Sequence, residues 1–477
     1  MVRRRELFRV TRLRRTYDRE ENKFTFKISY ETHTKPTPRS IVVAEAFGLG
    51  IDESETFTVL DTELKIKPTD VVFVTGDSGS GKSVLLRALK QDLGNSAADI
   101  GEIQVDSGKP LIETVGRTVE EGIELLSKVG LNDAFLFLRS YEQLSDGQKY
   151  RYKIAKIVES GKRWLLADEF AATLDRDTAK IVAFNLQKLA RQQGIAVVAA
   201  TTHKDLLQDL APNVLVEKRF GREIKVSYFP DAHASECSLT KEMSIEVGST
   251  ADWEGLAQFH YRGHRISAPR KIFRMTRKGE LCGVIVYSYS PPACYGRRLV
   301  LPRMSMKELN DKLCTINRVV VHPKYRTIGL GAKLIRETLA LAGTRYVELI
   351  AVMAKYSPFA EKAGMQRVAS QEPSKEVRTM ASMLEELGFD VKLLGSRNYV
   401  QKRLGNLTGQ QLELLKACLA RCGHPRFRKE FAISRHVPYG SSAEFKRCIS
   451  EADIPKMARL VRIVGMLVQK KVYLFWG

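Results

Sequence analysis

The chain has 477 residues, of which 44% are apolar, and a formal net charge of +22 at pH 7. This length allows two to four domains, each with its own core, and no apolar run approaches the ~20 residues that span a bilayer. The basic N-terminus lacks the apolar core of a secretory signal, and seven scattered cysteines form no disulfide framework. These features predict a cytoplasmic protein and no membrane partner.

The positive charge is concentrated at the two ends of the chain. Residues 1–40 carry 12 basic and 5 acidic side chains, and residues 371–477 carry 19 and 10. Basic ends favour contact with a polyanion such as RNA, DNA, a ribosomal surface or acidic lipid. A merely solvated surface has the same composition. We therefore treat residues 1–40 as a basic N-terminal arm and RNA or ribonucleoprotein as the expected partner.

Residues 41–230 alternate strand-like and helix-like segments, as a layered α/β domain does. The apolar strand "VVFVT" leads into a G-x-x-x-x-G-K-S loop, whose backbone N–H groups cradle phosphates. In such loops the lysine reaches the terminal phosphates and the final serine hydroxyl binds Mg²⁺. The predicted ATP site consists of Gly76, Asp77, Ser78, Gly79, Ser80, Gly81, Lys82 and Ser83.

Three further motifs follow this loop. The apolar strand in "RWLLADEF" ends at Asp168 and Glu169, where the first carboxylate can complete the Mg²⁺ shell and the second can orient the attacking water. The sequence "LSDGQ" (144–148) opens a helix, and the strand "AVVAAT" delivers His203. A P-loop, LSDGQ, an acidic pair and a histidine occur here in the order of ABC-type ATPases, which this region resembles.

The resemblance implies that the chain forms an ATP-dependent homodimer. In ABC-type ATPases the signature helix of one subunit covers the γ-phosphate held by the P-loop of the other. Ser145, Gly147 and Gln148 would make this contact here. Asp175 would lie at the subunit seam, and His203 would touch the γ-phosphate beside the catalytic carboxylate.

The region departs from the family pattern at several positions. Asp146 stands where glycine is usual in the signature, which predicts slow hydrolysis. Glu113, in the strand-like "LIETVG", stands where a glutamine is usual. Phe47 is the candidate for the aromatic side chain that stacks on adenine, although its distance from the P-loop in sequence is longer than common. A transporter role would require a separate membrane subunit.

Residues 243–370 contain a second strand–loop–helix unit. The strand "INRVVV" precedes an R-x-x-G-x-G loop and an amphipathic helix, and the glycines let the helix N-terminus approach a pyrophosphate. With its neighbouring strands, this region resembles the GNAT acyltransferases. That resemblance implies that acetyl-CoA binds, with its pantetheine paired to the strand near Val319 and Val321. The loop residues that would bind its phosphates are Arg326, Thr327, Ile328, Gly329, Leu330 and Gly331.

The sequence does not decide which residues carry out acyl transfer. Many GNATs have a glutamate in the strand before the loop and a tyrosine in a later turn, and this chain has Asn317 and Ala360 at those places. Tyr356 is the candidate general acid, with a packing role as the equal alternative. His322 fits a strand cap better than a base. An inactive GNAT fold kept as a binding module is the other interpretation.

Residues 371–477 form a basic region with two clear helical patterns, "SMLEELGF" and "LTGQQLELLKACLARCG". Cys418, Cys422 and His424, with or without Cys448, raise the question of a metal site. Zinc ligands usually show tighter paired spacing, and free cysteines are usually buried small hydrophobes. We favour the interpretation that these cysteines are buried and bind no metal.

The predicted fold class is thus α/β: an ABC-type P-loop ATPase domain, a GNAT-like domain and a helical C-terminal extension. The leading hypothesis is an ATP-gated acetyltransferase that moves an acetyl group from acetyl-CoA to an amine of a structured RNA or ribonucleoprotein. One alternative is a protein N-acetyltransferase with an ABC ATPase module. The other is a non-catalytic, nucleic-acid-binding ABC switch that senses acetyl-CoA.

Overall fold

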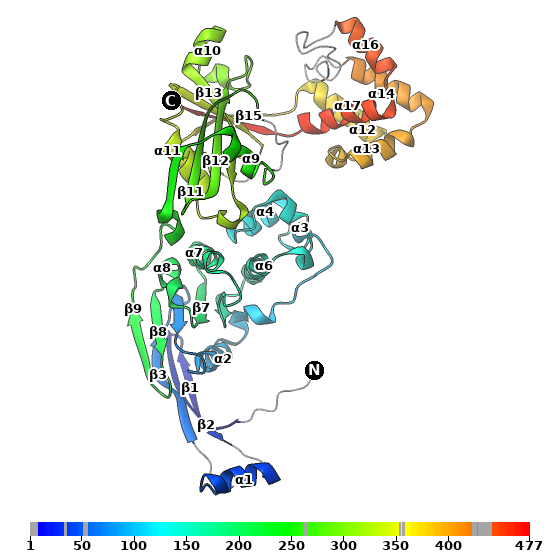
Figure 1. Cartoon of the computed structure of the whole chain (residues 1–477). Coiled ribbons are helices and arrows are strands. Elements are labelled where there is room, and N and C mark those ends of the chain that lie inside the picture. The colour runs from blue at the N-terminus through cyan, green and yellow to red at the C-terminus, as the bar shows by residue number, and fades with distance from the viewer. Residues whose placement is uncertain are drawn as a thin grey trace. The chain divides into compact units, whose positions relative to one another are not determined.

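The computed structural model describes residues 8–32, 36–50, 56–260, 266–352, 354, 358–421, 427 and 441–477 (Figure 1). Its internal contacts divide the chain into two compact units. The first comprises Met1–Ile266, Lys271–Val286 and Arg318–Glu337. The second comprises Ser267–Arg270, Tyr287–Asn317 and Thr338–Gly477. Within the described ranges, no helix has the length and apolarity required to cross a membrane.

The first unit is built around a six-stranded sheet with the strand order β5-β6-β7-β4-β8-β9. Its strands are β4 (Val71–Thr75), β5 (Ala97–Asp99), β6 (Trp164–Ala167), β7 (Ala196–Thr201), β8 (Val214–Lys218) and β9 (Ile224–Tyr228). Only the β8–β9 pair is antiparallel among the pairs recorded for these strands. Every residue of β4, β6 and β7 is buried, which explains their continuous apolar sequences, because helices cover both faces of parallel sheets.

Helices between residues 82 and 210 accompany this sheet (Figure 1). They are α2 (Lys82–Leu93), α3 (Leu111–Thr114), α4 (Val119–Lys128), α5 (Ala134–Phe137), α6 (Asp146–Glu159), α7 (Arg176–Gln193) and α8 (Leu207–Leu210). The P-loop leads directly into α2, and the LSDGQ segment leads into α6. The segment "LIETVG", which the sequence predicts to be a strand, contains the short helix α3 instead.

Residues 8–32 are part of a folded sheet and not a separate arm. Strands β1 (Phe8–Asp18), β2 (Lys23–Thr32) and β3 (Thr56–Lys65) pair antiparallel in the order β1-β2-β3. The alternating side chains Phe24, Phe26 and Ile28 are buried in the same hydrophobic cluster as residues of β4 and α2. The prediction of a basic arm over residues 1–40 is therefore corrected for residues 8–32, which belong to a sheet.

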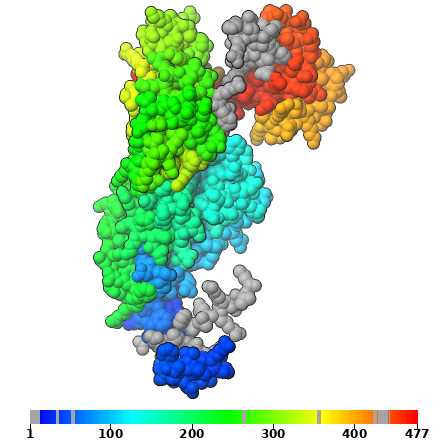
Figure 2. Space-filling model, viewed as in Figure 1, coloured from blue at the N-terminus to red at the C-terminus, as the bar shows by residue number. Residues whose placement is uncertain are grey.

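Helix α1 (Pro38–Ala46) lies in the connection between β2 and β3 and buries none of its residues. It starts with a capping box between Thr37 and Ser40 and a proline in its first turn, both of which favour helix initiation. In Figure 2 its dark-blue surface protrudes at the lower end of the view.

A second, seven-stranded sheet has the order β10-β11-β12-β13-β14-β16-β15. Its strands are β10 (Met243–Val247), β11 (Pro269–Arg277), β12 (Glu280–Tyr289), β13 (Leu313–Val321), β14 (Tyr346–Ala351), β15 (Gln366–Gln371) and β16 (Lys471–Trp476). Helices α9 (Thr250–Ala257), α10 (Met306–Lys312) and α11 (Leu330–Thr338) accompany them. β13 and β14 are parallel, whereas β16 is antiparallel to both of its neighbours.

The C-terminal region is helical until its last strand. Helices α12 (Lys375–Glu386), α13 (Arg397–Gly405), α14 (Gly409–Arg421), α16 (Ser442–Ser450) and α17 (Ile454–Leu467) share a hydrophobic core of their own. The following segment "KVYLFW" is strand β16, which pairs with β14 and β15. A helical extension over residues 371–477 is therefore an incomplete description, because this region also supplies a strand to the second sheet.

Candidate functional site

The loop between β4 and α2 has a backbone that favours glycine at three positions. Gly76, Gly79 and Gly81 have φ angles of +150°, +78° and +102°. A Cβ on Gly76 would lie 1.9 Å from the carbonyl oxygen of Lys218 in β8. A Cβ on Gly81 would lie 2.4 Å from Cγ1 of Val59 in β3. The loop is thus enclosed by two strands, which holds its N–H groups in the curved arrangement that binds phosphates.

Lys82 points back into this loop. Its Nζ donates to the carbonyl oxygens of Gly76 at 2.9 Å and Asp77 at 2.7 Å. Burial lowers the pKa of Lys82, although the charges of Asp168 and Asp77 oppose that effect. Ser80 is buried, and its Oγ has no hydrogen-bond partner among the described residues. A lysine ammonium and an unsatisfied hydroxyl beside curved backbone fit a polyphosphate.

The acidic pair and the histidine lie at the same edge of the sheet as the P-loop. β4 pairs with β7 up to Thr75 and Thr201, and β7 pairs in turn with β6. Because these strands are parallel, their carboxyl ends meet at one edge. Asp168 follows β6 and His203 follows β7.

Glu169 has a left-handed backbone with φ +48°, which is uncommon for a residue other than glycine. Its N–H donates to Oδ1 of Asp168 at 3.0 Å. The Glu169 side chain is exposed and that of Asp168 is half-buried. The Asp168 carboxylate at the end of β6 and the Ser83 hydroxyl at the start of α2 are oxygen ligands of the kind that Mg²⁺ prefers.

The signature residues form the N-terminus of α6. The N–H of Ser145 donates to Oε1 of Gln148 at 3.1 Å in a capping box. Asp146 occupies the first turn, where a negative charge stabilises the helix dipole. A Cβ on Gly147 would approach Cγ2 of Thr178 in α7 at 3.0 Å. Gly147 therefore lets α6 pack closely on α7, and Asp146 has a local reason to replace glycine.

Two sequence predictions in this region differ from the structure, and one aromatic residue was missed. Phe47 caps the C-terminus of α1 and is 77% exposed, with no contact that assigns it to the P-loop. Glu113 lies in helix α3 and not in a strand. By contrast Phe220, which is 64% exposed, has a ring carbon 3.9 Å from the Cβ position of Gly79. No motif marks Phe220, because the β8–β9 turn brings it there.

The second glycine loop follows β13 and leads into α11. Gly329 has φ +90°, and no atom lies within 4 Å of the position that its Cβ would occupy. Thr327 has φ +78°, which a β-branched residue rarely adopts. Ile328 and Leu330 are buried, so their side chains anchor the loop, whereas Val319 and Val321 are partly buried. The backbone at Gly329 is open to a ligand.

The polar side chains of this loop have partners within the protein. Arg326 donates through Nε to the Val321 carbonyl at 3.1 Å and through Nη2 to the Phe259 carbonyl at 3.1 Å. Its Nη1 forms an ion pair with Asp133. The Arg326 side chain is only 16% exposed. It does not offer a free guanidinium to a phosphate, which corrects its expected role in this conformation.

The structure assigns no functional site to the remaining predicted residues. Tyr356, Cys422 and His424 lie outside the described residues. Cys418 and Cys448 are partly buried. Over the parts of the chain that the structure describes, no group of three or more histidine, cysteine or acidic side chains is arranged to hold a metal.

A buried ion pair in the second unit was not predicted. Glu348 on β14 is 0% exposed, and its two oxygens accept from Nη2 and Nε of Arg297 at 2.7 and 3.0 Å. Thr315 Oγ1 and Tyr473 Oη also donate to it, at 2.8 and 3.0 Å. Burial raises the pKa of Glu348, but the hydrogen bonds and charge of Arg297 bring it below its usual value. Strand pairing over long sequence distances assembles this cluster, so no local pattern indicates it.

Comparisons with known proteins found relatives that match part of the chain. The chain is 29% identical over 201 residues to the methionine import ATP-binding protein MetN of Corynebacterium efficiens, with 34% of this chain and 55% of that protein covered. It is 28% identical over 242 residues to the phosphonates import ATP-binding protein PhnC 1 of Cupriavidus metallidurans, with 40% and 82% covered. The chain thus spans about half the length of the first relative.

Among solved structures, the dimeric ATP-binding cassette MJ0796 with bound ADP and phosphate aligns with 36% of this chain and 92% of its own. The identity is 20% and the TM-score is 0.30. No protein-family model matches the chain.

Proposed function

Because the chain contains an ABC-type ATPase domain, we propose that it is an ATP-gated acetyltransferase. It transfers an acetyl group from acetyl-CoA to an amine of a structured RNA or ribonucleoprotein. ATP-dependent homodimerisation of the ATPase domains controls when the substrate is engaged. The observation that carries the acetyl-CoA part is Gly329, at φ +90° in the loop between β13 and α11, with open space at its Cβ position.

The ATP part of the proposal is supported by the geometry of the first loop. Lys82, the unsatisfied Ser80 hydroxyl and the glycine backbone would bind the phosphates. Ser83 and Asp168 would hold Mg²⁺. Glu169 would orient the attacking water, and His203 would approach the γ-phosphate from the end of β7. Mg²⁺ supplies charge neutralisation for phosphoryl transfer when it is bound.

The acetyl-CoA part is supported by the second sheet and its loop. Backbone N–H groups at the start of α11 would bind the pyrophosphate, because helix N-termini attract anions, and Gly329 would let the ligand approach. Val319 and Val321 would pair with the pantetheine. Tyr356 is retained as the general acid, and a protonated hydroxyl there would reprotonate the departing thiolate.

Incubation of the full chain with ATP, Mg²⁺, labelled acetyl-CoA and total cell extract tests the proposal. We expect label in the RNA fraction. Label in the protein fraction alone would replace this proposal with a protein N-acetyltransferase. Acetyl-CoA binding by calorimetry without label in either fraction would indicate a non-catalytic sensor that binds nucleic acid.

The names of the relatives favour a second candidate, the ATP-binding subunit of an importer. MetN and PhnC 1 are both called import ATP-binding proteins. They match at most two fifths of this chain, so the second sheet and the helical region would have another role. Co-purification of the chain with a membrane subunit from detergent extracts, without acetyl-CoA binding, would support this candidate.

A further inference from the structure

The glycine loop after β13 is held by the ATPase part of the first unit. This unit includes Arg318–Glu337, and so contains the whole loop together with the six-stranded sheet and its helices. Three side chains of the loop contact residues that lie in helices of the ATPase or directly before one. We refer to these contacts as the loop clamp; its members are Lys324, Arg326 and Thr327 on one side and Asp133, Asp177 and Asn185 on the other.

The ion pairs of the loop clamp are partly shielded from water. Nζ of Lys324 lies 2.7 Å from Oδ2 of Asp177 and 3.6 Å from Oδ1 of Asp175. Nη1 of Arg277, on β11, lies 2.8 Å from the same oxygen of Asp177. Burial raises the pKa of Asp177, but hydrogen bonds from Lys324 and Arg277 bring it below its usual value. Asp177 is therefore charged at neutral pH and holds two cations.

A partly buried hydrogen bond joins the loop to α7. Nδ2 of Asn185, a residue that is 6% exposed, donates to Oγ1 of Thr327 at 2.7 Å. The same oxygen lies 3.1 Å from the Cβ position of Gly130. Nη1 of Arg151, on α6, donates to the Gly130 carbonyl at 3.2 Å. Thr327 is thus bonded directly to α7 and lies beside Gly130, whose carbonyl accepts from α6.

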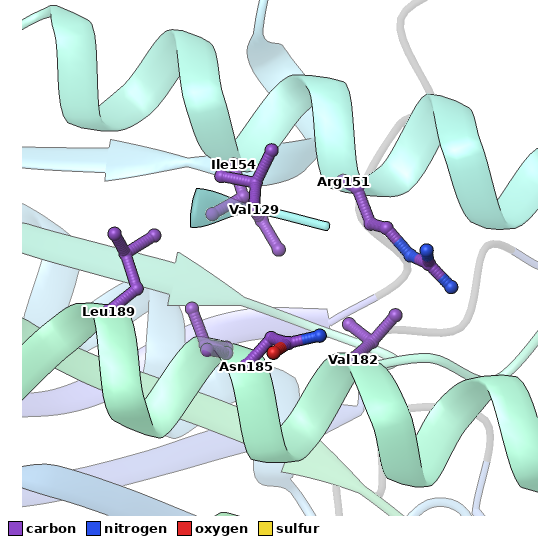
Figure 3. A pocket seen from close by; sticks show the side chains of 7 residues that line it. Val129, Arg151, Ile154, Val182, Asn185 and Leu189 are labelled. Atoms are coloured by element: carbon purple, nitrogen blue, oxygen red, sulfur yellow. The ribbon is translucent and has the colours of Figure 1, made fainter. Parts of the chain in front are cut away.

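The two helices are not fully packed at this point. Figure 3 shows Arg151 on one helix and Val182, Asn185 and Leu189 on the facing helix. They line a cavity of about 10 Å³, which is close to the smallest space that holds a water molecule. Nε of Arg151 has no hydrogen-bond partner among the described residues. The contact between α6 and α7 therefore contains a small void and one buried donor without a partner among the described residues.

Both helices start at predicted ATP-dependent contacts. α6 starts at the signature residues Ser145 and Asp146, and α7 starts directly after Asp175. In the proposed dimer these two helix starts lie at the nucleotide and at the subunit seam. ATP would therefore act on the same two helices that hold the loop.

We propose that the loop clamp is autoinhibitory, and that the ATP-bound dimer releases it and strengthens acetyl-CoA binding. The inference rests on the proposed function of the same loop. Without ATP, Asp133 and Asp177 neutralise Arg326 and Lys324, and their carboxylates repel a polyphosphate. Release would return two cations to the loop. Linkage requires that acetyl-CoA strengthen ATP binding by the same factor, and such couplings are typically about 5- to 150-fold.

Calorimetry of acetyl-CoA with the full chain tests the inference. ATP and Mg²⁺ added to the Glu169→Gln variant should raise the affinity at least about fivefold. Asp177→Asn should raise the affinity by a similar factor without ATP, and ATP should then add little. Asp133→Asn should also raise the acetyl-CoA affinity without ATP. This change keeps the side-chain cap of α5, because asparagine is also a good N-cap. Asp61→Asn on β3, which removes a charge paired with Lys27 on β2, should leave the acetyl-CoA affinity unchanged.

Equal acetyl-CoA affinity with and without ATP would overturn the inference and leave the proposed function intact. No acetyl-CoA binding in any state would overturn both. Hydrogen exchange of the unmodified protein gives an answer even if the aspartate variants do not fold. The backbone amides of residues 324–331 should exchange faster with ATP than without it, and unchanged exchange would also overturn the inference.

Discussion

Glu169 is the residue on which the proposed ATP hydrolysis depends most directly. Its exposed carboxylate follows β6 in a left-handed backbone conformation. Glu169→Gln keeps the size of the side chain and removes its ability to accept a proton. We expect ATP turnover to fall about 10²- to 10⁴-fold, while ATP binding persists and a dimer accumulates. Phosphate release assays and light scattering with ATP and Mg²⁺ measure the two effects.

The control for this change is Glu223→Gln in the β8–β9 turn, where the carboxylate pairs with Arg219 at 3.1 Å and both side chains are exposed. It should leave ATP turnover unchanged. A Glu169→Gln protein that binds ATP and stays monomeric would contradict the dimer model.

Gly329 and Gly279 form a matched pair of glycines. Their φ angles are +90° and +84°, and neither has an atom within 4 Å of its Cβ position. Valine at either place should destabilise the fold by about 1–2 kcal/mol or more, because left-handed backbone is unfavourable for side chains with a Cβ. Only Gly329→Val should also weaken acetyl-CoA binding in calorimetry. Equal loss of affinity in both variants would assign the effect to stability alone.

At this scale the sequence predicts backbone roles better than side-chain roles. Gly76, Gly79 and Gly81 in the first loop and Gly329 in the second have positive φ angles, because the need for glycine is local. The role of Arg326 was predicted from the same motif, yet its partner Asp133 is 193 positions away. A motif contains no information about such a partner.

At the scale of elements, the buried Glu348–Arg297 pair joins β14 to the segment before α10. Breaking such a pair by removing one partner typically costs about 3–5 kcal/mol, because the other charge stays buried. We expect this cost for Arg297→Met in denaturant unfolding. Removing both charges in Arg297→Met/Glu348→Leu should cost less. Glu372→Gln, in an exposed pair with Lys470, should stay within about 0.5 kcal/mol.

The same pair predicts a pH dependence of stability. The pKa of Glu348 in the folded protein lies below its ordinary value of 4.5. Its stabilising contribution is therefore fully present above that pH and is lost as the pH falls through the folded-state pKa. The stability difference between the unmodified protein and Glu348→Gln should be constant near neutral pH and shrink in acid. A difference that grows in acid would contradict this assignment.

Elements with strong local patterns were predicted well, and those that depend on distant pairing were not. β4 and α2 follow from an apolar run, a glycine loop and a helix start. The segment "LIETVG" has a strand-like composition, but residues 111–114 form a helix, which shows that propensity is a weak guide over so few residues. β16 resembles the end of a helical region in sequence, and only β14 and β15 make it a central strand.

At the scale of the whole molecule, the net charge of +22 predicts salt-sensitive RNA binding. Log affinity should fall linearly with log salt, by about 0.7 per phosphate contacted for single strands and about 0.9 for duplexes. Deleting residues 1–20 is a poor test, because it removes β1 from its sheet. Neutralising the exposed side chains of Lys392, Arg397 and Lys446 leaves the fold intact and should reduce the slope.

Filter binding at several salt concentrations measures this effect. The control is a variant in which Lys392 and Lys446 are changed to arginine. It should keep the slope of log affinity against log salt. RNA affinity that does not depend on salt, or no RNA binding, would favour a protein acceptor.

The pairing of β15 with β16 has a consequence for modularity. Gln371 and Lys471 are directly opposite each other in the antiparallel ladder, so their Cα atoms are separated by only about 5 Å. The helical region forms an insertion of on the order of 100 residues between these two positions. Bringing the ends of so long an insertion together carries an entropic cost. A two-residue Asn-Gly turn has the geometry to join these positions in its place. The shortened chain should keep the sheet and fold faster, since its adjacent strands would also be neighbours in sequence.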